Sequence, residues 1–254
     1  MSMKLTYATT IPITDVAARH PQPLPGRITG VLLDACNVLY DDTVWRRWML
    51  QLLSRLGLHT NYRCFFRVWD REFLDDVHCR RRDFDDAISA FLLSVGLSRG
   101  QIDEVLASCI GRRRQLQAAA RPLPGVRATL ARLYRSGIVL GAVCNSEHPG
   151  DEMQRRLQRM VGGPVFSTVV SSFDLGRTMP DERCYLTALA AMGRPVEQVA
   201  FVGHDAGELA GAAQLGMPTI ALNHDPEAQA HTYLDRFDDL IDVVKVPASL
   251  VAAG

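Results

Sequence analysis

Hydrophobic and polar positions follow different patterns in successive parts of the chain. Residues 28–33 form a short apolar run that ends at Asp34, which is typical of a strand buried on both faces of a parallel sheet. From about residue 43 to 120, apolar positions recur at helical spacing in three stretches. The third stretch, 102–110, follows Ser98, a residue type that favours a helix N-cap. We therefore expect one strand followed by a helical insert.

Beyond residue 121 the pattern changes to an alternation of helices and strands. The expected helices are 126–134, 151–160, 181–192, 206–215 and 234–243. The expected strands are 138–144, 165–171, 199–202 and 219–222. This alternation indicates an α/β fold with a doubly wound parallel sheet. Ligands of such sheets bind outside the carboxyl ends of the strands.

The expected organisation has three parts. Residues 1–27 are expected to form an irregular arm, because Pro21, Pro23 and Pro25 cannot lie in a regular helix. The other parts are a core domain of residues 28–42 and 121–254 and a helical domain of residues 43–120.

The composition of the chain argues against some classes of partner but does not indicate a particular function. The chain has 254 residues, 28 basic and 28 acidic, and a net charge of zero argues against nucleic acid or an anionic membrane as the main partner. No segment resembles a signal peptide or a membrane span. We expect a cytoplasmic protein with a small-molecule ligand. Its six cysteines show no metal-type spacing, and its two lysines are Lys4 and Lys245.

Four segments together carry a resemblance to a known family. They are VLLDACNVLYDD from Val31, VLGAVCNSE from Val139, SSFDLGRTMPDERCYLTAL from Ser171 and VAFVGHDAGELAGAAQLGMPTIAL from Val199. In this order and spacing, the chain resembles the haloacid dehalogenase-like (HAD) hydrolase superfamily over about residues 28–243. The resemblance implies a Rossmann-like core with an inserted α-helical cap.

The resemblance also implies a chemistry. An Asp at the end of the first strand attacks phosphorus, or a carbon that bears halogen, and forms an aspartyl intermediate. In the phosphatases a second Asp protonates the leaving group, and a Ser or Thr holds the phosphoryl oxygens. A Lys before a Pro neutralises the charge of the site, and the resemblance implies that phosphatases and dehalogenases both need it. One or two further acidic residues hold Mg²⁺.

This chain keeps the first of these residues and departs at the others. Asp34 matches the nucleophile. The substituted positions are Cys36 for the acid/base Asp, Cys144 for the Ser or Thr, Met179 for the Lys and His204 for the first metal-binding Asp. Dehalogenases also lack the second Asp, so Cys36 alone is compatible with carbon–halogen chemistry.

The resemblance therefore gives three sets of candidate residues. The catalytic candidates are Asp34, Cys36, Cys144 and Asn145, and the substrate-binding candidates are Asn145, Ser146 and Arg177. The metal candidates are Asp34, His204, Asp205 and Glu208. Mg²⁺ is the implied cofactor, and no cofactor is the alternative, because a nitrogen ligand at position 204 suits a hard cation poorly. Arg177 and Arg183 are candidate substitutes for the missing lysine.

Three functions follow from these residues. The first is a HAD-like hydrolase with an altered site, acting on a small phosphorylated or halogenated metabolite. The second is a non-catalytic protein of the same fold that binds a ligand or a partner, in which the cysteines and Met179 only fill space. The third is a site for a soft metal such as zinc, built from Cys36, Cys144 and His204. His224 in the segment 223–225 is a more distant candidate, in an expected turn.

Overall fold

The protein is built around one parallel sheet. The structure is a computed structural model that describes residues 24–58 and 67–244. The sheet has six strands in the order β3-β2-β1-β4-β5-β6, and every pair is parallel. The strands are β1 Gly30–Asp34, β2 Val139–Cys144, β3 Phe166–Ser171, β4 Val199–Gly203, β5 Thr219–Leu222 and β6 Thr232–Leu234. The predicted α/β fold is confirmed.

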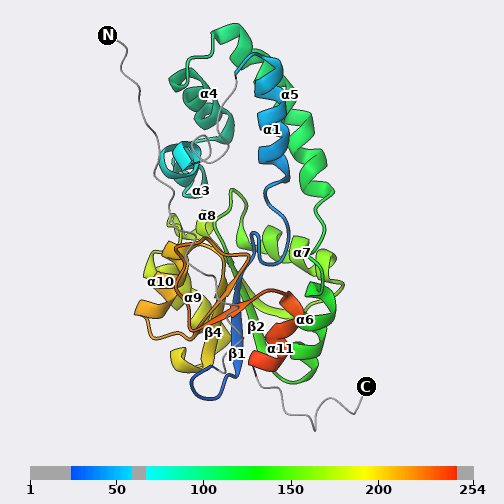
Figure 1. The fold of residues 1–254 in the computed structure, drawn as a ribbon, viewed down its shortest axis with the longest axis vertical. Helices are drawn as coiled ribbons and strands as arrows, with labels where there is room; N and C mark the ends of the chain where they lie inside the picture. Colours follow the sequence, from blue (N-terminus) through cyan, green and yellow to red (C-terminus); the bar gives the residue numbers. More distant parts are fainter. Residues whose placement is uncertain (1–23, 59–66, 245–254) are drawn as a thin grey trace, which may run out of the picture.

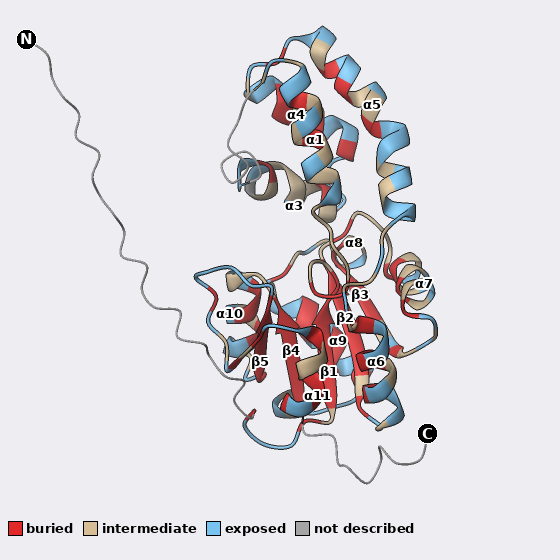
Figure 2. Ribbon diagram, turned by 45° about the vertical axis from the view of Figure 1, so that its right-hand side comes forward, coloured by how far each residue is buried: buried red, intermediate tan, exposed pale blue. Residues whose placement is uncertain are grey.

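Helices cover both faces of the sheet (Figure 1). Val31 and Leu33 of β1 pack with one set of helices, and Leu32 between them packs with the other, because successive strand residues point to opposite faces. The first set is α6 Val126–Arg135, α7 Gly150–Val161 and α11 Leu240–Val243. The second set is α9 Glu182–Met192 and α10 Ala206–Gln214. Figure 2 shows that the central strands are buried throughout.

The helices between β1 and β2 lie apart from the sheet (Figures 1 and 2). They are α1 Val44–Arg55, the π-helix η1 Asp70–Leu74, α3 Asp75–His78, α4 Phe84–Ser94 and α5 Arg99–Ala118. They share a separate apolar core in which Trp69 is fully buried against Phe84 and Phe91. We propose that this lobe is the cap domain expected over residues 43–120.

The boundary of α5 agrees with the sequence pattern. Ser98 accepts a hydrogen bond from the backbone N–H of Gln101, and the side chain of Gln101 accepts one from the N–H of Ser98. This reciprocal capping box satisfies two backbone donors at the start of the helix. The predicted N-cap at Ser98 is confirmed.

The end of the chain differs from the prediction. The prediction of a helix over 234–243 is wrong, because Leu234 ends strand β6 and the helix begins only at Leu240. Strand β6 pairs with β5, with Leu222 opposite Leu234. Pairing with a distant strand satisfies the backbone of this segment, and local sequence does not reveal such a partner.

The remaining short elements are α8 Ser172–Leu175 and the 3₁₀ turns η2 Val196–Gln198 and η3 Phe237–Asp239. The expected arm of residues 1–27 lies outside the described residues except for 24–27. None of the described helices is both long and apolar enough to span a membrane.

Candidate active site

The candidate site lies at the carboxyl ends of the central strands. Strand β1 ends at Asp34 and lies between β2, which ends at Cys144, and β4, which is followed by His204. Because the three strands are parallel and adjacent, these side chains meet at one edge of the sheet. The sheet topology thus brings together residues far apart in the sequence.

Asp34 and His204 are hydrogen-bonded at the centre of the site. Nδ1 of His204 lies 2.7 Å from Oδ2 of Asp34, and the other carboxylate oxygen accepts the backbone N–H of Cys36 at 3.1 Å. Asp34 is only 1% exposed. Burial alone would lower the pKa of His204, but the hydrogen bond to Asp34 and its charge outweigh burial and leave this pKa raised.

Asn37 fixes the orientation of the imidazole. Oδ1 of Asn37 accepts the backbone N–H of Asp42 at 3.3 Å, so Nδ2 faces Nε2 of His204 at 3.2 Å as a donor. Nε2 is therefore the accepting nitrogen, and Nδ1 carries the proton shared with Asp34. Asn37 has a φ of 57°, a left-handed conformation that Asn tolerates better than most residues. Sequence reasoning missed Asn37, although its type and its place after a strand are typical of such a turn.

Glu208 belongs to a second polar chain. Its Oε1 accepts from Nδ2 of Asn145 at 3.1 Å, and Oδ1 of Asn145 accepts the backbone N–H of Met179 at 2.8 Å. Burial, followed by the negative charge of Asp34, raises the pKa of Glu208 well above its ordinary value. Its Oε2 is buried without a hydrogen-bond partner among the described residues. These features favour a neutral carboxylic acid that positions Asn145.

The two cysteines near the site are poor acids. Burial first, then the charges of Asp42 and Asp34, raise the pKa of Cys36 well above its ordinary value. Burial and Asp34 raise the pKa of Cys144 to about 12. Sγ of Cys36 lies 3.5 Å from the hydroxyl of Tyr40, and Sγ of Cys144 lies within reach of a backbone carbonyl oxygen. Both thiols are therefore protonated at neutral pH.

The positions next to Met179 offer no cation to the site. Met179 is buried in the apolar cluster beneath α9. Arg177 and Arg183 instead face Asp181 on the surface, with N–O distances of 3.9 Å and 2.9 Å. The structure thus does not bring Arg177 to the other candidate residues. Ser146 does lie in the site region, where its N–H donates to the hydroxyl of Ser172 at 2.9 Å.

The chemistry of the acidic cluster does not suit Mg²⁺. Within the described residues, one group of potential ligands has its atoms within 4.8 Å of one another, namely Asp34, His204 and Glu208. Mg²⁺ prefers ionised oxygen ligands in an octahedral arrangement. Here one carboxylate is paired with an imidazole and the other carboxyl favours its neutral form. Asp205 is occupied as the N-cap of α10, where it accepts from the N–H of Glu208 at 3.0 Å.

The zinc hypothesis also finds no support in this arrangement. Neither Cys36 nor Cys144 belongs to that ligand group, and both pKa values are raised, whereas zinc binds thiolates. His224 lies outside the site, with its ring against Tyr233.

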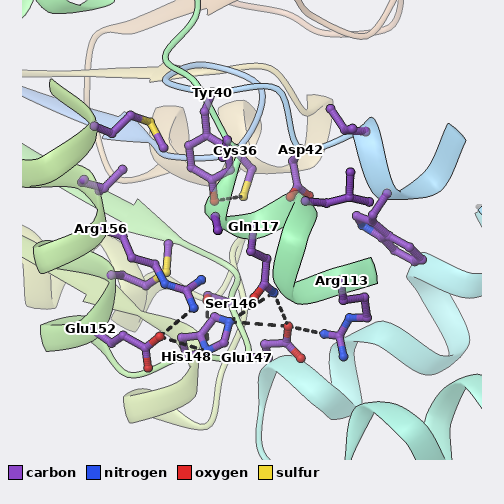
Figure 3. Close-up of a pocket in the computed structure, with 18 of the residues that line it drawn as sticks. Cys36, Tyr40, Asp42, Arg113, Gln117, Ser146, Glu147, His148, Glu152 and Arg156 are labelled. Carbon is purple, nitrogen blue, oxygen red and sulfur yellow. Dashed lines mark hydrogen bonds and ion pairs between the residues drawn. The ribbon is translucent and has the colours of Figure 1, made fainter. Parts of the chain in front are cut away.

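A cavity of about 690 Å³ lies between the cap lobe and the core. Its walls come from the loop after β1, the loop after β2, the end of α5 and one side of α7. Figure 3 shows Cys36, Tyr40 and Asp42 on one side of it, and Glu147, His148 and Glu152 on the other. Asp34 does not line the cavity itself, but Cys36 and its neighbours across the sheet edge do.

Asp42 was not a candidate from sequence. It lines the cavity, and burial raises its pKa to about 6, with Arg46 opposing and Asp34 adding to the shift. It lies in the same turn as Asn37, whose side chain holds its backbone N–H.

Comparisons with known proteins agree with this geometry. The family of haloacid dehalogenase-like hydrolases matches residues 28–216. A glyceraldehyde 3-phosphate phosphatase of Methanocaldococcus jannaschii is 24% identical over 86% of this chain and 97% of its own length. An (S)-2-haloacid dehalogenase 4A of Burkholderia cepacia is 30% identical over 44% of this chain and 49% of its own.

Solved structures show the same fold. An L-2-haloacid dehalogenase of Xanthobacter autotrophicus, with chloropropionic acid covalently bound, has a TM-score of 0.59 at 18% identity over 87% of this chain and all of its own. A HAD-superfamily hydrolase of Geobacter sulfurreducens has a TM-score of 0.60 at 20% identity over 87% of this chain and 98% of its own. Since the family match spans most of the sequence, from strand β1 into the fourth of the segments that carry the resemblance, this chain belongs to the haloacid dehalogenase-like hydrolases.

Proposed function

We propose that the protein hydrolyses a bond between carbon and a leaving group such as halide, with Asp34 as the nucleophile. The observation that carries the proposal is the 2.7 Å contact between Nδ1 of His204 and Oδ2 of Asp34. It gives the carboxylate one adjacent partner that can both carry positive charge and accept a proton.

The surroundings of Asp34 favour carbon over phosphorus. A phosphoryl group brings negative charge that donors and cations must stabilise. At the corresponding positions this chain has a buried thiol, Cys144, and a buried thioether, Met179. A substrate with a neutral carbon centre brings no phosphoryl charge to these positions, and apolar neighbours suit it.

In the first step an oxygen of Asp34 attacks the substrate carbon. The halide leaves with the bonding electron pair, and Asp34 becomes an alkyl ester. The N–H of Cys36 holds Oδ1 at 3.1 Å and fixes the plane of the carboxylate during attack.

In the second step water adds to Cγ of the ester, and its proton passes to Nε2 of His204, the ring nitrogen that carries no proton. The N–H of Cys36 is placed to stabilise the negative charge that develops on Oδ1. The intermediate collapses to the alcohol, which takes the proton back from His204, and the acid form of Asp34 loses its proton to solvent. One substrate and one water yield one alcohol, one halide ion and one proton.

A second candidate function has its own support. Asp34 is 1% exposed, both of its oxygens are engaged, and it does not line the cavity. A protein that binds a ligand in the cavity without turnover would leave the carboxylate in this state. Phosphatase chemistry at the same site is less well supported, because Cys36 replaces the acid/base Asp and Cys144 replaces the Ser or Thr that holds phosphoryl oxygens.

Release of bromide from 2-bromopropionate and 10-bromodecanoate, beside release of phosphate from p-nitrophenyl phosphate, tests the proposal. We expect bromide from the native protein and none from Asp34→Asn. Loss of the base in His204→Gln should lower kcat about 10²–10⁴-fold. His224→Gln, at an exposed histidine outside the site, is the matched control and should keep full activity. Phosphate release alone would overturn carbon chemistry, and ligand binding without either product would favour the second candidate.

A further inference from the structure

The far part of the cavity carries an excess of positive charge. Its walls at the end of α5, along α7 and at the link to the core contain five arginines, namely Arg113, Arg114, Arg121, Arg156 and Arg159. The acidic residues of the same part are Glu147 and Glu152. The other acidic lining residues, Asp41 and Asp42, belong to the turn after β1, beside Cys36. The cavity lining is therefore acidic in the turn after β1 and basic along α5 and α7.

Two of these arginines are held in place. Arg113 forms an ion pair with Glu147, and its guanidinium lies 3.2 Å from the ring centroid of Phe84. Arg156 pairs with Glu152 at 2.7 Å on α7. Figure 3 shows these two arginines on opposite sides of the cavity, one from the cap lobe and one from the core. Fixed guanidinium groups lose little entropy when they bind an anion.

Three further arginines are not neutralised. Arg114, Arg121 and Arg159 are exposed and have no ion pair with any residue in the described parts of the chain. Their charge is available to a ligand, which supports an anion rather than a neutral or cationic group at this side.

Apolar side chains lie among the charged ones. Leu116 of α5 and Met153, Leu157 and Met160 of α7 line the same cavity. A volume of about 690 Å³ lies within the range that encloses drug-sized ligands. A two- or three-carbon acid would leave most of this space and most of these apolar surfaces in contact with water.

We propose that the cavity binds an elongated amphipathic anion, with its apolar body against α5 and α7 and its anionic group on the arginines remote from Asp34. That this ligand is also the substrate rests on the proposed function, which requires its reactive carbon at the acidic end. Binding itself does not depend on turnover.

Isothermal titration calorimetry with decanoate tests the proposal, with acetate and decan-1-ol as probes of the two halves of the ligand. The matched variants are Arg156→Gln, which lines the cavity, and Arg155→Gln, which does not. Arg155 is 58% exposed and pairs with Asp151 at 2.8 Å, so each variant removes one equivalent ion pair from α7. Arg114→Gln and Arg112→Gln provide a second pair on α5, since only Arg114 lines the cavity.

We expect decanoate to bind the native protein, and to bind at least about tenfold more weakly to Arg156→Gln and Arg114→Gln. Arg155→Gln and Arg112→Gln should bind it as the native protein does, and acetate and decan-1-ol should bind far more weakly. The proposal would be overturned if both variants of a pair lost the same affinity for decanoate. It would also be overturned if acetate or decan-1-ol bound as tightly as decanoate, or if decanoate did not bind. Decanoate has no leaving group, so a failure to bind it would not contradict hydrolysis at Asp34. Equally, an absence of bromide release would not contradict binding of the anion in the cavity.

Discussion

The ring of His204 sits where an oxygen ligand would serve a metal ion. Its Nδ1 faces Oδ2 of Asp34, so the carboxylate is hydrogen-bonded to an imidazole and not left to a metal ion. Glu208 remains close by but favours its neutral form. The nitrogen of a single residue, His204, therefore takes a place in the ligand group where an acidic residue would supply a further oxygen.

His204→Asp should create Mg²⁺ affinity. The shorter acidic side chain removes the partner of Asp34 and supplies the oxygen that a hard cation prefers, so Mg²⁺ should bind at least about tenfold more tightly than to the native protein. Calorimetric titration with MgCl₂ measures this directly. His204→Gln is the control, since it removes the ring without adding charge. Tight Mg²⁺ binding by the native protein, or no gain in His204→Asp, would contradict our account of the site.

A second prediction concerns His78, which lines the cavity from the cap lobe. Burial lowers its pKa from 6.5 to about 4. The unfolded chain therefore takes up this proton before the folded protein does, and the stability contributed by neutral His78 is complete above pH 6.5 and lost as the pH falls to about 4.

Between pH 7 and pH 4 the native protein should lose about 1–3 kcal/mol more of its unfolding free energy than His78→Gln does. Urea denaturation at several pH values measures the difference. His224→Gln, at an exposed histidine, should follow the native curve. Identical pH slopes for the native protein and His78→Gln would refute the prediction.

At the residue scale, sequence identified which positions meet but not how they pair. Asp34, Cys144, Met179 and His204 stand at the ends of predicted strands or in the motifs beside them. The direction of the His204 ring depends on Asn37, whose left-handed backbone and amide orientation arise from contacts made only in the folded protein. No local pattern reports such a contact across 167 positions.

At the scale of elements, strongly periodic segments were predictable and the edge of the sheet was not. The helical insert and the alternation after residue 121 follow from apolar spacing. Strand β6 Thr232–Leu234 is too short to show a period, and its partner β5 decides its conformation. The π-helix η1 was not predicted either, because a single π-helical turn leaves a sequence pattern that resembles that of an α-helix.

Two helical glycines should respond oppositely to the same substitution. A Cβ at Gly111 in α5 meets nothing within 4 Å, so Gly111→Ala should raise the unfolding free energy by about 0.5–1 kcal/mol. A Cβ at Gly211 in α10 would lie 2.8 Å from Cβ of Pro180 and 3.1 Å from its carbonyl oxygen. Gly211→Ala should lower the unfolding free energy by about 1–3 kcal/mol, because backbone must move.

Thermal and chemical denaturation compare the two glycine variants. Gly211→Ala should also reduce activity, since Pro180 follows Met179, whose N–H is held by Asn145. If Gly211→Ala had a higher unfolding free energy than the native protein, the close contact between α10 and the turn that carries Met179 would be contradicted.

At the scale of the whole molecule, the site is divided between two lobes. The core supplies Asp34 and His204, and the cap lobe closes the cavity through α5 and the ion pair of Arg113 with Glu147. Glu147 lies in the loop after β2, two residues after Asn145. The ion pair of Arg113 with Glu147 therefore connects the cap lobe to the loop that carries Asn145, so the cavity depends on both lobes.

The central claim is that Asp34 itself attacks the substrate, and oxygen labelling tests it most directly. The protein would turn over 10-bromodecanoate and, separately, 2-bromopropionate repeatedly in H₂¹⁸O, and mass spectrometry would then measure the peptide that contains Asp34. Because water attacks Cγ of the ester, we predict that ¹⁸O accumulates in the Asp34 carboxylate, and that it does not in the absence of bromoacid. Bromide release with an unlabelled Asp34 would show that water attacks the substrate directly, and no bromide release from either acid would contradict hydrolysis by this site.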